Sequence, residues 1–173
     1  MISKGEGRWP RQLRSKRLRL RAIIPADLTD EPPEWLAAAE EEILGREHPV
    51  ALHAQVQEDA AAYWIDLRPP GGPCTVGALS ARLTQGDLVW GWLAVAPAWR
   101  ARGLAAASAA LVERAAVRAG AGRARVRVSA ANGVALYFWL RLGYRPLPPS
   151  LPGIALSRDG DDRGGTWMLR ELS

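Results

Sequence analysis

The chain has 173 residues, of which 48% are apolar, and a formal net charge of +5. This length suits one compact domain with a core of its own, and the apolar fraction excludes a disordered chain. A single cysteine, Cys74, excludes an intrachain disulfide and favours a reducing compartment. No apolar run reaches the ~18 residues of a membrane span and no apolar signal stretch opens the chain, so we expect a cytoplasmic protein without membrane contact.

The charges are sorted by sign along the chain. Residues 1–21 hold eight basic residues and one acidic residue. Residues 22–66 hold one basic and eleven acidic residues, and residues 67–173 hold fourteen basic and six acidic residues. Such blocks indicate surfaces of opposite charge. We expect residues 1–16 to form a flexible basic lead-in and residues 17–173 a single domain. Because Trp9 is the only aromatic residue of the first block, we do not expect that block to bind nucleic acid.

In the N-terminal half, alternating apolar and basic residues predict a strand over residues 18–22. Two prolines before an acidic first turn predict a helix from Glu34 to about Leu44, and a second helical stretch follows at about residues 50–58. Three strands over residues 63–67, 75–83 and 88–95, separated by turns at 69–73 and 85–87, predict an antiparallel meander. In the last strand we interpret Trp90 and Trp92 as sharing one face.

The period then changes to that of a helix. Apolar residues recur at helical spacing over residues 103–119, and two glycines end the helix. A strand over 123–128, a helix over 132–142, a loop over 146–162 and a strand over 166–172 follow. A strand–helix–strand sequence implies a parallel pairing. We therefore predict an α/β fold in which one twisted mixed sheet of six to seven strands carries helices on both faces.

The junction between residues 95 and 106 reads V-x-P followed by R-x-x-G-x-A. Free backbone N–H groups and the helix dipole at a helix N-terminus attract phosphate, and the small Gly103 and Ala105 allow close approach. The chain lacks the glycine patterns of dinucleotide and nucleoside triphosphate loops. An ordinary strand–helix junction with surface arginines explains the same residues, so both interpretations stay open.

A second motif lies nearer the C-terminus. Residues 132–144 read N-x-x-A-x-x-x-W-x-x-L-G-Y. In this order, the two motifs resemble those of the GCN5-related N-acetyltransferases (GNAT), with the close match over about residues 88–144. The resemblance implies splayed central parallel strands and acetyl-CoA as the acyl donor for an amine. It places the pantetheine arm against the strand end, the oxyanion at Val95 and the diphosphate at the loop. The implied cofactor contacts are Leu93, Ala94, Val95, Arg100, Ala101, Arg102, Gly103, Leu104, Ala105, Ala106 and Asn132, the last of which equally suits a helix N-cap.

The catalytic residues are unknown from the sequence. The position that often holds a proton-donating tyrosine in the family carries Trp139, and Tyr137 lies about 200° around the helix from it. Two positions that hold a carboxylate base in some members carry Val89 and Arg127. Either positioning and water relays suffice for the transfer, or the domain binds acyl-CoA in a regulatory role with weak turnover.

The acidic block over residues 22–66 falls where the family's first helices border the acceptor site. This suggests a cationic small molecule or a basic peptide end as the acceptor, although a solvated helix face explains the same charges. His48 and His53 lack partners at metal-ligand spacing, so we expect no metal. The resemblance also allows a homodimer, and a basic nucleic-acid-binding domain is the third interpretation of the chain.

Overall fold

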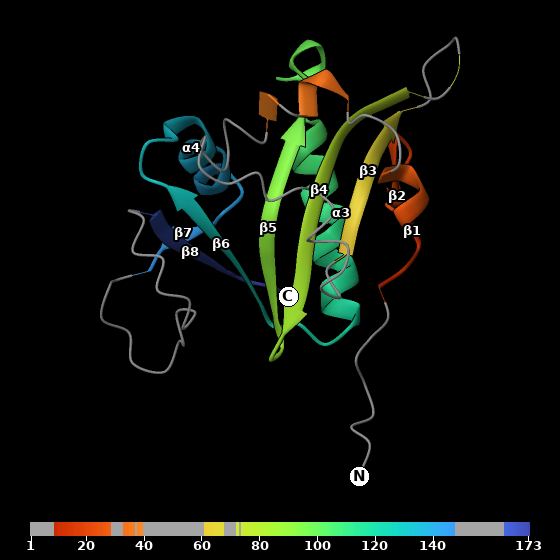
Figure 1. Ribbon diagram of the computed structural model, residues 1–173. Helices are drawn as coiled ribbons and strands as arrows, with labels where there is room; N and C mark the ends of the chain where they lie inside the picture. The colour runs from red at the N-terminus through yellow and green to blue at the C-terminus, as the bar shows by residue number, and fades with distance from the viewer. Residues whose placement is uncertain are drawn as a thin grey trace.

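In the computed structural model, the chain folds around one mixed sheet (Figure 1). The structure describes residues 9–28, 33–36, 38–39, 61–67, 72, 74–147 and 165–173. The sheet has eight strands in the order β1-β2-β3-β4-β5-β6-β8-β7. The strands are β1 (Gln12–Arg14), β2 (Leu18–Ala22), β3 (Ala61–Leu67), β4 (Cys74–Thr84), β5 (Asp87–Val95), β6 (Arg123–Ser129), β7 (Arg145–Pro146) and β8 (Gly165–Glu171).

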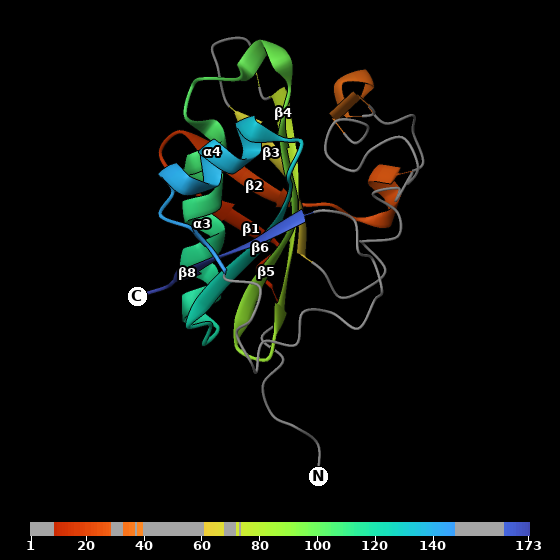
Figure 2. The ribbon, with the colours of Figure 1, turned by 90° about the vertical axis from the view of Figure 1, so that its left-hand side faces the viewer.

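The two faces of the sheet are covered by different segments. Helices α3 (Leu104–Arg118) and α4 (Gly133–Arg141) lie on one face, and residues 34–36 and 38–39, which are helical, lie on the other (Figure 2). The larger core cluster lies on the first face, and a smaller one joins Leu36 and Ala39 to Trp64 and Trp92 on the second. This arrangement confirms the predicted mixed α/β fold with helices on both faces.

The pairing of the strands confirms the predicted meander. Strands β1 to β5 pair antiparallel in sequence order, and β5 and β6 form the one parallel pair of the described sheet. Strand β8 pairs antiparallel with both β6 and β7. The sheet exceeds the predicted six to seven strands because β1 and β7, with three and two residues, are too short for alternation to reveal. The predicted helix over 50–58 and most of the loop over 146–162 lie outside the described residues.

A bulge in β5 overturns one expectation. The register between β4 and β5 shifts between Ser80 and Ala81, which pair with Trp92 and Trp90, so Gly91 is an extra residue. An extra residue reverses the alternation of side chains beyond it. Trp90 therefore packs in the core beneath α3 and Trp92 in the cluster on the opposite face. The expectation that the two tryptophans share a face is wrong.

Part of the predicted basic lead-in belongs to the sheet. Residues 12–14 form β1, so this part of residues 1–16 is not a flexible tail. Trp9 packs against the core, and the buried Tyr63 donates a hydrogen bond to the carbonyl of Pro10. Burial raises the pKa of Tyr63 to about 12, which keeps this donor protonated. These contacts hold the start of the described chain against β3.

Gly77 on β4 occupies a position that only glycine fits. A Cβ atom there would lie 2.5 Å from the Ala94 carbonyl oxygen and 2.9 Å from Ile65 Cδ1. We expect Gly77→Ala to lower the free energy of unfolding by about 1–3 kcal/mol, because a crowded core must shift to admit the methyl group. Urea unfolding measures the change. Gly122→Ala is the control, since its Cβ would meet nothing within 4 Å; equal losses in both variants would contradict the steric argument.

Candidate acyl-CoA site

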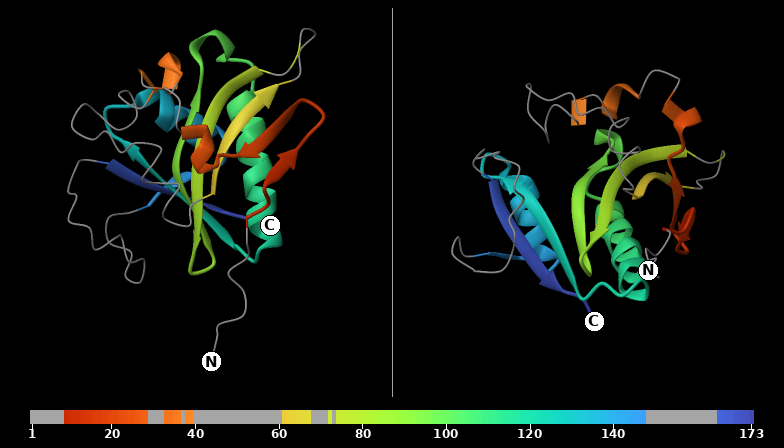
Figure 3. Two further views of the ribbon diagram at one scale, coloured as in Figure 1. Left: turned by 45° about the vertical axis from the view of Figure 1, so that its right-hand side comes forward. Right: turned by 60° about the horizontal axis from the view of Figure 1, so that its bottom comes forward.

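The parallel strands β5 and β6 pair at one end only. Their register runs from Asp87 opposite Arg123 to Trp90 opposite Val126, and no pairing follows over the rest of either strand. Figure 3, right, shows the two strands meeting at one end and diverging toward the other. At the joined end, the buried Asp87 accepts ion pairs from Arg123 and Arg125, each at 3.0 Å. A buried carboxylate thus joins the strands at the base of the divergence.

Beyond Trp90, the backbone of β5 turns polar groups toward the gap between the two strands. The Ala96 N–H donates to the Val76 carbonyl at 2.8 Å on the β4 side. Because hydrogen-bonded and non-hydrogen-bonded pairs alternate in an antiparallel ladder, Ala94 also bonds toward β4, and Leu93 and Val95 point away from it. The main-chain groups of Leu93 and Val95 therefore face β6, where the ladder has ended.

The loop between β5 and α3 has an unusual backbone. Pro97–Trp99 forms a 3-10 turn, and Ala101 and Gly103 then adopt left-handed conformations with φ of 59° and 75°. A left-handed alanine is strained, and such strain concentrates at functional sites. Left-handed residues in a tight turn aim successive N–H groups into one concavity that suits anions. Among the described residues, none of the N–H groups of residues 101–106 donates to a backbone carbonyl.

Both arginines of the loop brace it. Arg100 donates from Nε to the Val95 carbonyl at 3.0 Å, which ties the loop to the end of β5. The Arg102 guanidinium lies over the Trp99 ring, 4.8 Å from its centroid. Both side chains are exposed, so their positive charge acts at the same surface as the N–H groups.

Asn132 caps the helix that follows β6. Its Oδ1 accepts from the Ala135 N–H at 2.9 Å, as expected of an N-cap residue. Because parallel strands end at the same edge of a sheet, α4 begins on the side of the molecule where α3 begins. The cap leaves the side-chain NH₂ group of Asn132 as a donor at this open end.

Trp139 closes the interior behind the site. It is 5% exposed and lies 5.4 Å from Trp90 and 4.9 Å from Tyr144 between ring centroids. An indole packed in this way has no acidic proton to give a leaving thiolate. Tyr137 is 62% exposed on the far side of the helix, as its helical angle predicted.

A chain of hydrogen bonds runs through the core beside Trp139. Trp90 Nε1 donates to the Tyr144 hydroxyl at 2.7 Å, and that hydroxyl donates to Glu113 Oε1 at 2.7 Å. Arg170 of β8 donates to Glu113 Oε2 at 2.9 Å. Four segments are joined in this way: β5, the turn that follows α4, α3 and β8.

Burial is the main cause of the pKa shifts of Glu113 and Tyr144 in this hydrogen-bonded chain. It raises the pKa of Glu113 above the ordinary 4.5, against the Tyr144 hydrogen bond and the Arg170 charge, which lower it. Burial also raises the pKa of Tyr144, and the Glu113 charge adds to the rise. Tyr144 is 0% exposed, so it holds the neighbouring groups in place and does not meet a substrate.

The structure brings the predicted site residues to one edge of the sheet. Leu93 to Val95, the loop and Asn132 all lie where β5 and β6 have diverged. Asp87, Glu113 and Tyr144 were not predicted. Glu113 occupies an apolar stretch of its helix (LVERAAV), which is the one sequence signal of a buried carboxylate. Of the predicted acidic block, the acids from Glu40 to Glu47 lie outside the described residues, as do both histidines, so the acceptor and metal expectations stay predictions.

Comparison with known proteins points to one family. A family model described as "Acetyltransferase (GNAT) family" matches residues 20–144. No curated protein matches the chain. A probable GNAT acetyltransferase from Chromobacterium violaceum is 18% identical with a TM-score of 0.70, over 99% of this chain and 92% of its own. A GCN5-related N-acetyltransferase from Brucella melitensis is 15% identical with a TM-score of 0.68, over 95% and 80%.

A third solved structure is named for its acceptor. The ribosomal-protein-S18-alanine N-acetyltransferase from Escherichia coli is 15% identical with a TM-score of 0.62, over 90% of this chain and 94% of its own. At these identities the three structures show a shared fold. No helix among the described residues is long and apolar enough to cross a membrane.

Removing the Tyr144 hydroxyl should destabilise the core. We expect Tyr144→Phe to lower the free energy of unfolding by about 1–3 kcal/mol, because Trp90 Nε1 loses its acceptor and Glu113 Oε1 its donor away from water. Chemical unfolding followed by tryptophan fluorescence measures the loss. Tyr137→Phe removes the same atom from an exposed ring and should change stability by less than about 0.5 kcal/mol. Similar values for the two variants would argue against the buried chain.

Glu113 should make stability fall as pH rises. A carboxyl whose folded-state pKa is raised stabilises the fold fully below its unfolded pKa, and this contribution is lost as pH rises through the folded pKa. Relative to the wild type, Glu113→Gln should therefore gain stability as pH rises above about 4.5, whatever its offset at low pH. Urea unfolding at a series of pH values measures the difference, and a difference independent of pH would contradict the assignment.

Proposed function

Because the chain belongs to the acetyltransferase (GNAT) family, we propose that it is an N-acetyltransferase that moves an acetyl group from acetyl-CoA to a primary amine. One observation carries this proposal: the strands β5 and β6 part after Trp90, beside a loop whose N–H groups have no backbone acceptor among the described residues. Both features leave main-chain donors and acceptors that an extended, phosphorylated ligand can satisfy.

The diphosphate of the donor suits the loop. Six consecutive N–H groups over residues 101–106 and the positive end of α3 provide hydrogen bonds and charge complementarity. The surroundings of Gly103 are open, because a Cβ atom added there would meet nothing within 4 Å. Arg100 and Arg102, held by Val95 and Trp99, add positive charge at the same surface.

The pantetheine arm would complete the interrupted ladder. Its amides can pair with the outward main-chain groups of Leu93 and with the Val95 N–H, in the manner of a strand added between β5 and β6, while the Val95 carbonyl already accepts from Arg100. Ala94, whose polar groups face β4, would contribute the surface of its backbone and no hydrogen bond. The NH₂ group of Asn132 can reach the arm from the other wall. The thioester would then lie near the Val95 N–H.

The transfer itself needs little covalent chemistry from the protein. The amine nitrogen attacks the thioester carbonyl, a tetrahedral oxyanion forms, and the C–S bond breaks to release a thiolate. The Val95 N–H can stabilise the oxyanion. The attacking nitrogen loses a proton and the thiolate gains one. With Trp139 at the donor position and Val89 buried, we propose that water carries these protons and that positioning supplies most of the rate.

The same tryptophan supports a second candidate function. A domain with Trp139 in the tyrosine position can bind acyl-CoA firmly and turn it over weakly, as a regulatory sensor would. The two candidates share the binding site and differ in turnover. Release of free CoA thiol in the presence of amines therefore distinguishes them, and binding without thiol release across the whole panel would favour the sensor.

The acceptor is proposed as a cationic amine. The support is the acidic block over residues 22–66 in the sequence, of which Glu34 is described and exposed. The name of the E. coli neighbour specifies an alanine of a ribosomal protein, so the panel should include peptide N-termini beside polyamines and aminoglycosides. Acetylation of neutral or acidic amines alone would contradict the cationic assignment and leave the acyltransferase assignment standing.

Gly103 provides the sharpest test of the donor site. We expect Gly103→Glu to weaken acetyl-CoA binding at least tenfold, or by roughly 1.4 kcal/mol, and to reduce thiol release in parallel, because a carboxylate then meets the diphosphate. Calorimetry and the thiol assay measure these effects.

Gly120→Glu is the matched control for this variant. Gly120 follows the other end of α3, is also left-handed with φ of 94°, and has equally open surroundings. Both variants therefore place a side chain at a positive φ and add the same charge. The control should bind acetyl-CoA like the wild type, and normal binding by Gly103→Glu would overturn the diphosphate assignment.

A further inference from the structure

The hairpin at the edge of the sheet carries a second cluster of positive charge. Contrary to the expectation from the sequence, which rested on the lack of aromatic residues for stacking, we propose that this basic hairpin binds the phosphate backbone of a nucleic acid without sequence preference. It consists of β1, β2 and the turn between them, and β1 is the terminal strand of the sheet. Its cations are Arg14, Lys16, Arg17, Arg19 and Arg21, and Arg11 directly precedes β1.

The register of the hairpin places like charges together. Arg14 is directly opposite Arg19, while Leu13 is opposite Leu20 on the face toward the core. Like charges directly opposite each other destabilise an antiparallel pair. Asp66, which pairs with Arg19, offsets part of this repulsion, and a bound anion would relieve the rest.

Nearby acids neutralise only part of this charge. The buried Asp66 pairs with Arg19 at 2.9 Å and with Arg21 at 3.2 Å, and it accepts a hydrogen bond from Thr75 at 2.9 Å. Arg21 also pairs with Asp27 at 3.2 Å. Both described acids near the hairpin are thus occupied by Arg19 and Arg21.

The cations at the turn are left over. No described carboxylate lies within ion-pair distance of Arg14, Lys16 or Arg17, and all three are exposed. Arg14 donates to the uncharged Gln12 side chain at 2.8 Å. The hydroxyl of Ser15 accepts from the N–H groups of Arg17 and Leu18, each at 3.2 Å, so the turn that presents the three cations is itself ordered.

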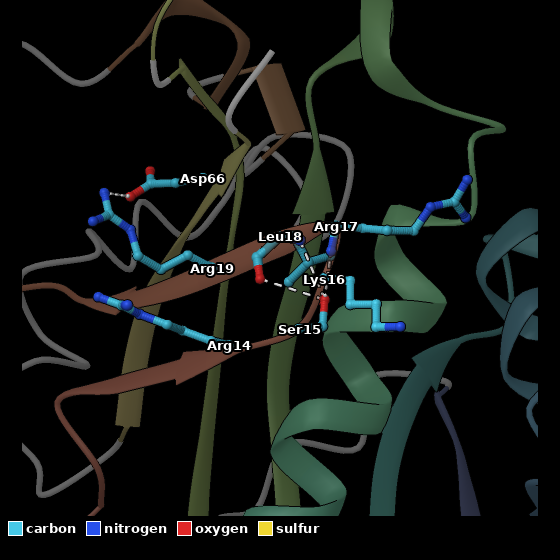
Figure 4. Close-up of a pocket in the computed structure, with 7 residues that line it drawn as sticks. All are labelled: Arg14, Ser15, Lys16, Arg17, Leu18, Arg19 and Asp66. Carbon is cyan, nitrogen blue, oxygen red and sulfur yellow. Dashed lines mark hydrogen bonds and ion pairs between the residues drawn. The ribbon is translucent and has the colours of Figure 1, made fainter.

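The turn borders a cavity of about 250 Å³ whose lining includes Asp66; Figure 4 shows its lining side chains. Arg14 and Arg19 extend to one side of the turn, while Lys16 and Arg17 extend to the other (Figure 4). Sites for small molecules usually measure about 300–1,000 Å³ and are mostly apolar. A chain of phosphates that crosses the turn fits this arrangement better, since it meets cations on both sides.

The identity of the cations and of their neighbours favours nucleic acid over a membrane. Most are arginines, whose planar guanidinium binds phosphate through two hydrogen bonds. A membrane-bound surface would also present apolar side chains, but the exposed large apolar residues of the described chain are Ile24, Val117, Val134 and Tyr137, and none lies in the turn. Trp9 packs inward, which leaves no ring for base stacking and predicts binding without base preference.

Within the sheet, strands β3 and β4 stand between this surface and β5. On the helical face of the sheet, α3 packs against both β1 and β2. The proposal does not depend on acetyl transfer, and acetyl-CoA binding measured on the same protein samples keeps the two assignments apart.

The test is fluorescence anisotropy of labelled duplex DNA and duplex RNA with the full chain, between about 50 and 200 mM salt. The triple variant Arg14→Gln/Lys16→Gln/Arg17→Gln should bind both duplexes at least tenfold more weakly. Its slope of log affinity against log salt should be shallower by about 0.9 for each lost phosphate contact. Its affinity for acetyl-CoA should equal that of the wild type.

The control removes the same charge elsewhere. Arg82→Gln/Arg114→Gln/Arg118→Gln changes three exposed arginines of β4 and α3 and should bind the duplexes within about twofold of the wild type, a shift of a few tenths of a kcal/mol. Equal losses in the two triple variants would overturn the proposal in favour of a general charge effect. Tighter binding to phosphatidylserine vesicles or polyglutamate than to either duplex would also overturn it. If the hairpin variant fails to fold, Arg17→Glu alone, at an exposed turn position, should show the same selective loss.

Discussion

The open end of the sheet depends on how β5 and β6 are held at their closed end. Asp87 is buried between them and carries two arginine contacts, and the paired register ends after four residues on each strand. A buried carboxylate is costly unless its partners are present. The arginines of β6, which alternate with its buried apolar residues, supply those partners at the base of the divergence. The pair is thus pinned at one end and free to part at the other.

Strands that part leave main-chain groups to be satisfied. Leu93 and Val95 turn their N–H and C=O groups away from β4 because Gly91 and the bulge set the phase of the remaining ladder. The Val95 carbonyl accepts from Arg100, and the other groups require water or a ligand. At the paired end, Trp139 packs against Trp90, and the hydrogen-bonded chain from Trp90 to Arg170 joins β5, α3 and β8.

Most of the elements follow from local patterns, since alternation and helical spacing reveal the long strands and both described C-terminal helices. The loop that leads into α3 is also a local pattern, because it combines a helix start with glycine. What the sequence hides is long-range. Glu113 and Tyr144 lie 31 residues apart, and no local sequence pattern around either residue predicts their hydrogen bond. The bulge at Gly91 depends on the register with β4, so the faces of Trp90 and Trp92 could not be assigned from β5 alone. The short strands β1 and β7 are defined by their hydrogen-bonded pairing with β2 and β8.

Arginines stabilise the fold in one part of this sheet and remain exposed in another. The nearby carboxylates determine which of these two roles an arginine has. At β6, Arg123 and Arg125 share the single carboxylate of Asp87, which neutralises one of their two charges and pins the base of the two strands. At the hairpin, Asp66 and Asp27 serve Arg19 and Arg21, and the remaining cations project into solvent from a turn ordered by Ser15. A net charge alone cannot separate these cases, because an arginine paired with a buried carboxylate and an exposed one count equally. The number of carboxylates within reach on the neighbouring strand determines whether a basic strand stabilises the fold or is available to a partner.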